Sequence, residues 1–163
     1  MKILSVCVLG YTIMVLARTT VGSELTKRFL TCAGGWSKVN DRLFCYVPTP
    51  LTWPKAENNC RFMGANLASV HNLKEYNKVQ SLVRKITHSF KESWIGGFDL
   101  EGEKLFLWSD GGVFNFGEWC QGEPGYRNRY QGCIVINQGD KKCWASHHCY
   151  KKYSSICAKK VLA

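Results

Sequence analysis

The sequence predicts an α+β fold with two helices, small antiparallel sheets and a long loop region stapled by disulfides. Two windows in the first half of the chain repeat apolar residues at the helical period, whereas the second half has only short runs typical of strands. That second half is rich in glycine and aromatic residues, and the chain has nine cysteines among its 163 residues. A chain of this length suits one domain with its own core.

Residues 1–22 are expected to be a secretory signal peptide. A positive charge at Lys2 precedes a mostly apolar stretch and then small residues, which is the usual order in such leaders. A membrane span would need about 18 unbroken apolar residues, and polar residues up to Arg18 interrupt this stretch. We therefore expect a secreted, extracellular protein without a transmembrane segment, an extension over residues 23–31 and a domain over residues 32–160.

Removal of the leader takes away Cys7 and leaves an even number of cysteines. In an oxidising compartment an even count favours disulfides over free thiols or zinc ligands, so we expect four bridges. Eight cysteines allow 105 pairings, and spacing alone does not choose among them. The remaining cysteines are Cys32, Cys45, Cys60, Cys120, Cys133, Cys143, Cys149 and Cys157.

The expected mature chain is strongly basic. Without Lys2 and Arg18 it keeps 20 of the 22 basic residues against 12 acidic ones, a formal charge of +8. Such a charge favours association with anionic surfaces, for example sulfated glycans, bacterial envelopes or acidic lipid. A soluble protein that is basic without such a partner is the alternative. Secretion argues against a nucleic-acid partner.

Local patterns place the elements of the first half. Residues 32–48 alternate apolar and polar positions around a turn at Asn40 and Asp41, which predicts a disulfide-closed hairpin. A first helix is expected to start at a Thr52 cap and to end at Gly64. A second helix is predicted from the capping pair Asn72 and Glu75 and from one apolar stripe. The stripe consists of Leu73, Tyr76, Val79, Leu82, Val83 and Ile86.

The second half begins with an irregular stretch. Residues 94–133 contain nine glycines, no helical period and short strand-like runs such as residues 105–108. A stretch of this length in a compact domain is usually a functional loop region. Two short strands with a turn at residues 138–140 follow, and residues 154–160 predict a final strand.

Several stretches together resemble the C-type lectin-like domain. They are "TWPKAENNC", "GANLASVHNLKEYNKV", "SWIGGFD", "LFLWSDGG", "FNFGEWCQGEP", "CIVI", "KCW" and "SSICAKK", and they extend over nearly all of the chain after Cys32. Within this family the sequence is similar to small secreted fish lectins of the ladderlectin and galactose-binding kinds and to type II antifreeze proteins. The resemblance implies that residues 94–97 belong to the hydrophobic core of the fold. It also implies the bridges Cys32–Cys45, Cys60–Cys157, Cys133–Cys149 and Cys120–Cys143.

The resemblance also locates a calcium site that this chain has degraded. Sugar-binding members hold calcium with an E-P-N or Q-P-D tripeptide, a glutamate two residues before a loop cysteine, and an Asn-Asp pair after a tryptophan. Here Glu123 keeps its carboxylate, Gly125 and Ala145 have no side-chain oxygen, and Gln131 and Ser146 have no charge. Calcium needs six to eight oxygen ligands, several of them carboxylates. We therefore expect no calcium and no other cofactor.

The residues in and around the former calcium-ligand positions favour a basic and aromatic surface in place of a calcium site. Arginine forks bind sulfate or carboxylate, and tyrosine rings stack on sugar faces. The alternative is an exposed loop whose arginines only add solubility. A zinc site at the two adjacent histidines is disfavoured because neighbouring side chains diverge. The candidate ligand-binding residues are Glu123, Tyr126, Arg127, Asn128, Arg129, Tyr130, Gln131, His147 and His148.

The predicted function is that of a secreted lectin-like recognition protein in innate defence, independent of calcium. Its partners would be carbohydrate, anionic glycans or microbial surfaces, and the sequence is compatible with an oligomer. One alternative is an ice-binding protein of the type II antifreeze kind, and another is a calcium-dependent carbohydrate-binding lectin. An enzyme is not expected, since the chain has no G-x-S-x-G, H-E-x-x-H or phosphate-binding loop motif.

Overall fold

The computed structural model describes residues 31–99, 105–125 and 132–161. The chain divides into the units Met1–Thr31 and Cys32–Ala163, and the architecture below is that of the second unit. Its elements combine helices with strands, which confirms the α+β class. In chain order they are β1 (Ala33–Val39), β2 (Arg42–Leu51), α2 (Trp53–Phe62), β3 (Asn66–Leu67), α3 (Leu73–Thr87), β4 (Ser93–Asp99), β5 (Phe106–Trp108), β6 (Gly132–Gln138), β7 (Cys143–His148) and β8 (Tyr153–Lys160).

The strands join in one mixed sheet rather than in several small ones. The main path runs β1-β2-β8-β4-β6-β7, with β3 paired to β8 and β5 paired to β4. The pairing of β4 with β8 is parallel, and the other pairings are antiparallel. The hairpins β1–β2 and β6–β7 both match the sequence prediction, and each lies at one end of the sheet path.

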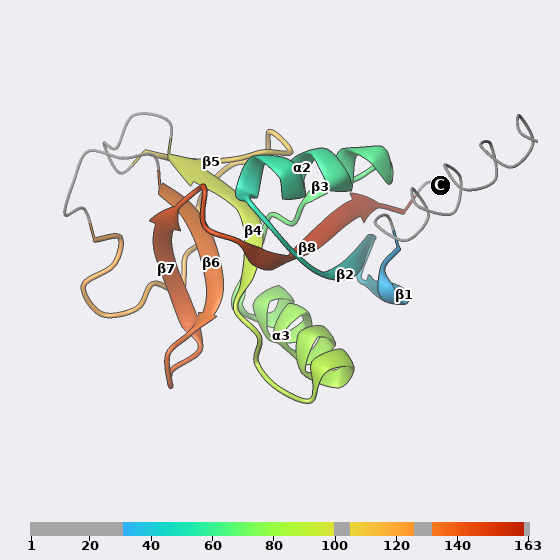
Figure 1. Ribbon diagram of the computed structural model, residues 1–163, viewed down its shortest axis with the longest axis horizontal. Helices are drawn as coiled ribbons and strands as arrows, with labels where there is room; N and C mark the ends of the chain where they lie inside the picture. Colours follow the sequence, from blue (N-terminus) through green and yellow to red (C-terminus); the bar gives the residue numbers. More distant parts are fainter. Residues whose placement is uncertain (1–30, 100–104, 126–131, 162–163) are drawn as a thin grey trace, which may run out of the picture. The chain divides into compact units, whose positions relative to one another are not determined.

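The two helices cover opposite faces of the strands β2 and β8 (Figure 1). Successive residues of a strand point to opposite faces, and β2 shows this alternation. Phe44 and Tyr46 pack in the cluster that contains the buried stripe of α3. Cys45 and Val47 pack in the cluster that contains Ala56 of α2. The alternation places one hydrophobic core on each side of the sheet.

The ends of α2 agree with the prediction, except for the capping bond. Thr52 occupies the N-cap position, but its side chain makes no capping hydrogen bond. The helix ends at Phe62, and Gly64 has a φ of +67°, the left-handed conformation that glycine adopts readily. The face toward the sheet is buried at Ala56 and Cys60, which are fully inaccessible to solvent.

Helix α3 begins as its capping residues predict. The Asn72 side chain accepts a 2.9 Å hydrogen bond from the backbone N–H of Glu75. The predicted stripe is buried at its four central positions, Tyr76, Val79, Leu82 and Val83. Leu73, the first residue of the stripe, is 51 % exposed. As the first residue of the helix, Leu73 lies beside a surface hollow instead of the core.

The predicted core stretch in β4 is confirmed. Trp94 and Ile95 are completely buried. A Cβ atom at Gly96 would lie 2.5 Å from the carbonyl oxygen of Leu67, and one at Gly97 would lie 2.2 Å from Ile134 Cδ1. Both glycines are therefore needed for the close approach of neighbouring strands.

The four disulfides follow the pairing implied by the resemblance. They are Cys32–Cys45, Cys60–Cys157, Cys120–Cys143 and Cys133–Cys149. The Cys60–Cys157 bridge joins α2 to β8, and the last two bridges hold the segments around β6 and β7. Among the described residues, no helix is long and apolar enough to cross a membrane.

Candidate functional site

The predicted ligand position at Glu123 lies beside strand β7. The segment before it is fixed by a backbone pairing of Trp119 with Trp144 and by the disulfide of Cys120. Glu123 Oε2 accepts hydrogen bonds from the backbone N–H groups of Gly125, at 2.8 Å, and of Ser146, at 3.0 Å. The Glu123–Pro124 peptide bond is cis. The carboxylate therefore holds the loop and β7 together through backbone donors.

These residues do not fit calcium. Oε2 of Glu123 already accepts two N–H groups, and its neighbours Gly125 and Ala145 have no side-chain oxygen. The Ser146 hydroxyl packs so closely on Gly132 that a Cβ there would lie 2.1 Å from Ser146 Oγ. Within residues 31–99, 105–125 and 132–161, no three His, Cys, Asp or Glu side chains group to hold a metal ion. Calcium requires more charged oxygen ligands than this arrangement offers.

The two adjacent histidines of β7 contact different partners. His147 Nδ1 lies 2.7 Å from the hydroxyl of Tyr153, and the side chain is half-buried. Burial lowers the pKa of His147, and the charge of Lys151 lowers it further, while Glu92 and Glu123 oppose both effects. The exposed His148 ring packs on Tyr150 at 5.3 Å between ring centroids. The two rings therefore contact different tyrosines, Tyr153 and Tyr150.

Six of the nine candidate ligand residues, Tyr126, Arg127, Asn128, Arg129, Tyr130 and Gln131, lie outside the described residues. The other three are Glu123, His147 and His148, and only His148 is fully on the surface. Next to it lie Tyr150, which is 71 % exposed, and the exposed Lys151 and Lys152. The exposed surface at residues 148–152 is therefore cationic and aromatic, and we call it the loop border.

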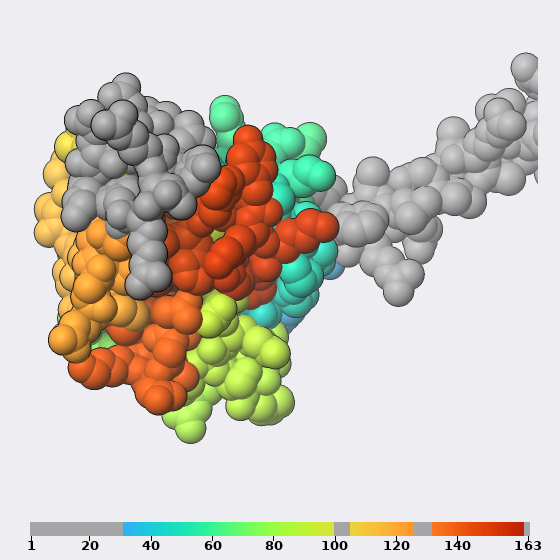
Figure 2. Space-filling model, turned by 60° about the vertical axis from the view of Figure 1, so that its left-hand side comes forward, coloured from blue at the N-terminus to red at the C-terminus, as the bar shows by residue number. Residues whose placement is uncertain are grey.

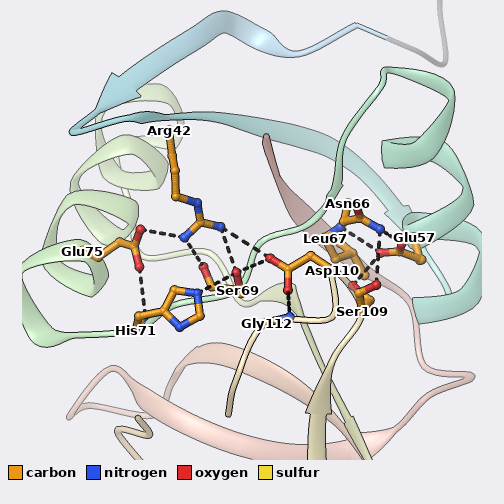
Figure 3. Close-up of polar contacts among 10 residues, drawn as sticks. All are labelled: Arg42, Glu57, Asn66, Leu67, Ser69, His71, Glu75, Ser109, Asp110 and Gly112. Carbon is orange, nitrogen blue, oxygen red and sulfur yellow. Dashed lines mark hydrogen bonds and ion pairs between the residues drawn. The ribbon is translucent and has the colours of Figure 1, made fainter. Parts of the chain in front are cut away.

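A second polar cluster, which sequence reasoning missed, lies between α3 and the segment after β5 (Figure 3). Arg42 Nη1 donates to Glu75 Oε1 at 2.7 Å and to the carbonyl oxygen of Ser69 at 3.1 Å. Arg42 Nη2 donates to Ser69 Oγ at 2.9 Å and lies 3.9 Å from Asp110 Oδ2. The Ser69 hydroxyl donates to Asp110, and His71 Nε2 lies 3.1 Å from Ser69 Oγ. We call these five residues the Arg42 network.

The Arg42 network borders a polar hollow of about 720 Å³, but its geometry does not match a catalytic triad. Ser69 is completely buried, and its hydroxyl hydrogen points to Asp110 instead of to His71. A nucleophilic serine would instead donate to the histidine, and the carboxylate would orient that histidine. The network therefore attaches the segment after β5, through Asp110, to β2 and α3. The signal for it in the sequence was weak, because Arg42 and Asp110 are 68 positions apart.

The chain is similar to several known proteins. The family model described as Lectin C-type domain matches residues 49–159. Ladderlectin of Oncorhynchus mykiss is 41% identical over 124 residues, which are 76% of this chain and 65% of that protein. A type-2 ice-structuring protein of Osmerus mordax is 36% identical, over 82% of this chain and 74% of that one. The galactose-specific lectin nattectin of Thalassophryne nattereri is 33% identical, over 86% of this chain and 89% of that one.

Solved structures show the same arrangement of elements. The type II antifreeze protein of herring superposes with a TM-score of 0.72 at 35% identity, over 78% of this chain and 97% of that one. A calcium-independent type II antifreeze protein superposes with a TM-score of 0.67 at 30% identity, over 82% of this chain and 97% of that one. The matched proteins are lectins and antifreeze proteins, which bind their targets without catalysis.

Proposed function

Because the chain belongs to the C-type lectin domain family, we propose that it is a recognition protein that binds glycans or anionic microbial surfaces without calcium. The proposal rests on the hydrogen bonds of the Glu123 carboxylate. Its Oε2 accepts hydrogen bonds from the N–H groups of Gly125 and Ser146. A carboxylate used in this way supports the loop without a metal ion.

The chemistry of the loop border supports an anionic or sugar ligand. Tyr150 offers an exposed ring, and Lys151 and Lys152 offer two exposed ammonium groups. Arg127 and Arg129 belong to the stretch of the sequence that precedes β6, between Tyr126 and Tyr130. Guanidinium groups form paired hydrogen bonds with sulfate and carboxylate, and aromatic rings pack on sugar faces. The ligand would be recognised by charge and stacking.

A glycan array probed with and without calcium tests this function. We expect the same glycans to bind in millimolar calcium and in chelator, and the binding to weaken as salt rises. An Arg127→Ala, Arg129→Ala double variant should lose most of this binding, whereas the control Lys55→Ala, Arg61→Ala, with the same charge removed from the exposed face of α2, should keep it. Binding only in calcium would favour the calcium-dependent lectin, and binding unchanged in the loop variant would reject the basic surface.

Ice binding is the second candidate function. It is supported by the ice-structuring relative of Osmerus mordax and by the herring antifreeze structure, which share 36% and 35% identity with this chain. Against it, the loop sequence is basic and has long side chains, while an ice surface favours a flat, weakly charged protein face. Thermal hysteresis of the purified protein separates the two functions, since a lectin-like protein should show none.

We further propose that the protein acts outside the cell, in innate defence. The expected leader over residues 1–22 and the four disulfides both suit secretion. Expression of the full chain in animal cells, followed by N-terminal sequencing of the protein in the medium, tests this. A new N-terminus near residue 23 is expected, and retention of the intact chain in the cells would contradict it.

A further inference from the structure

Two surface hollows meet at the side chain of Phe90, in the segment between α3 and β4. The larger one, of about 570 Å³, is lined among others by Phe90, Lys91 and Lys152. The smaller one, of about 310 Å³, is lined among others by Phe90, Lys141 and Lys142. On the face shown in Figure 2, the yellow-green segment that follows α3 lies between the orange β6–β7 turn and the red C-terminal part of the chain. Phe90 is therefore a lining residue that the two hollows share.

Two cations lie on the ring of Phe90. The guanidinium carbon of Arg84 is 5.4 Å from the ring centroid, and Lys142 Nζ is 5.9 Å from it. Both distances are in the range of a cation–π contact. An aromatic ring shared by two cations keeps them close together in spite of their mutual repulsion. A ligand that brings negative charge to this ring relieves the repulsion.

The β6–β7 turn that holds Lys142 is firmly attached to α3. The carbonyl oxygen of Lys142 accepts hydrogen bonds from the hydroxyl of Tyr76 and, at 2.9 Å, from Gln80 Nε2. Lys142 Nζ donates to the carbonyl oxygen of Gly139 at 2.7 Å. Since the backbone is fixed by Tyr76 and Gln80 of α3, the ammonium group needs little ordering when a ligand binds.

The charge around Phe90 is mostly positive. Arg84 and the four lysines of the hollows outnumber the carboxylates that line them, Glu92 and Glu118. Lys85 in α3 and Asp140 in the turn add one charge of each sign nearby. A surface of this kind attracts polyanions and raises their rate of association. We name it the Phe90 strip, and it consists of Arg84, Phe90, Lys91, Lys141, Lys142 and Lys152.

We propose that the Phe90 strip binds a linear sulfated glycan. A chain that carries sulfates at short intervals matches two cations that share one ring and the lysines of the two hollows, because each of these cations can bind a sulfate. A single phosphate or carboxylate would use only one of the two hollows. Apart from Lys152, the strip does not overlap the residues of the proposed loop surface, so its function does not depend on that proposal.

Binding to immobilised heparin, a sulfated glycosaminoglycan, tests the proposal on the full secreted chain. We expect the Arg84→Ala, Lys142→Ala double variant to bind roughly tenfold more weakly, with a smaller dependence on salt. Phe90→Leu should weaken binding by a smaller factor, because the ring that holds Arg84 and Lys142 together is lost while the charges remain. The Lys142 substitution keeps the carbonyl group that Tyr76 and Gln80 bind, so the fold should persist, and thermal unfolding checks this.

Matched variants separate this strip from general charge and from the loop. The control Lys55→Ala, Arg61→Ala removes two exposed cations from α2, on the other side of the sheet. Equal loss in the control and in the Arg84, Lys142 variant would overturn the proposal, because net charge alone would then explain binding. So would loss of all heparin binding in the Arg127→Ala, Arg129→Ala variant. Retention there, with loss only in the strip variant, would support the strip even if the loop binds nothing.

Competition with heparin by other molecules identifies the class of ligand that the Phe90 strip binds. Fully desulfated heparin should fail to compete with heparin, whereas dextran sulfate should compete. A single-stranded DNA oligomer or vesicles of anionic phospholipid that compete as well as dextran sulfate, with the same loss in the strip variant, would contradict a sulfated glycan as the ligand.

Discussion

The backbone N–H of Ser146 donates a 3.0 Å hydrogen bond to the carboxylate of Glu123, across 23 positions of the sequence. The same oxygen accepts the N–H of Gly125. Hydrogen bonds from backbone N–H groups to a charged carboxylate are stronger than those to a neutral acceptor, and loss of the carboxylate leaves the N–H donors without an acceptor. Glu123 thus stabilises the loop directly.

Replacement of Glu123 by alanine should reduce stability without any change in metal dependence. We expect the free energy of unfolding to fall by about 1 to 2 kcal/mol, because two backbone donors lose their charged acceptor. Urea unfolding of Glu123→Ala measures this, with Asp140→Ala as a control that removes one exposed carboxylate from a turn. Equal unfolding midpoints for the two variants would contradict the structural role.

The Arg42 network should be a major source of stability. Arg42 pairs with Glu75 at 2.7 Å, and the two side chains are only 13% and 6% exposed. Removal of one partner from a buried pair leaves an uncompensated charge, so Arg42→Ala should cost about 3 to 5 kcal/mol. Arg61→Ala, at an exposed position of α2, is the control and should change little. Thermal and urea unfolding of both variants provide the comparison, and a small loss for Arg42→Ala would show that the network is dispensable.

His147 should make stability depend on pH below neutrality. Burial and Lys151 lower the pKa of His147 from its ordinary value of 6.5. The unfolded chain therefore binds a proton more readily than the folded one, so stability falls as pH drops through 6.5 toward the lowered pKa. The His147→Gln variant should show a flatter dependence in this window, while His148→Gln should behave like the parent. An unchanged pH profile in His147→Gln would contradict the assignment.

Tyr76 should make stability depend on pH in the alkaline range. Burial raises the pKa of Tyr76 well above its ordinary value of 10.0, and its hydroxyl donates to the carbonyl oxygen of Lys142. Since the phenol ionises earlier in the unfolded chain, stability should fall as pH rises above 10. Tyr76→Phe should remove much of this fall and cost about 1 kcal/mol at neutral pH. Unfolding curves at pH 7 and pH 10.5 test it, with the exposed Tyr150→Phe as control.

The sequence predicted local structure well, because the signals were local. Asn72 caps α3 as expected, and the cysteine positions led to four correct bridges through the resemblance. The Arg42 network was not predicted, since its members come from three separate segments and each fits its own segment as an ordinary polar residue. The exposure of Leu73 was not predicted either, because helical period alone does not show where the neighbouring element ends.

The ligand-binding role of the candidate site stays a prediction, since six of its nine residues lie outside the described residues. The residue types indicated that Gly125 and Ala145 offer no side-chain oxygen and that Ser146 offers no charge, but not that Glu123 accepts the N–H of Ser146. Hydrogen bonds from backbone groups leave no trace in residue types, so this contact required coordinates. The Phe90 strip was hidden for a similar reason, because Arg84 and Lys142 are 58 positions apart and meet only on the ring between them.

Calorimetric titration of the purified protein with calcium tests whether the Glu123 carboxylate serves the loop and not a metal ion. We expect no saturable heat up to millimolar calcium, and the same baseline for the parent chain and for Glu123→Gln. Saturable uptake with a micromolar dissociation constant in the parent, lost in Glu123→Gln, would contradict it.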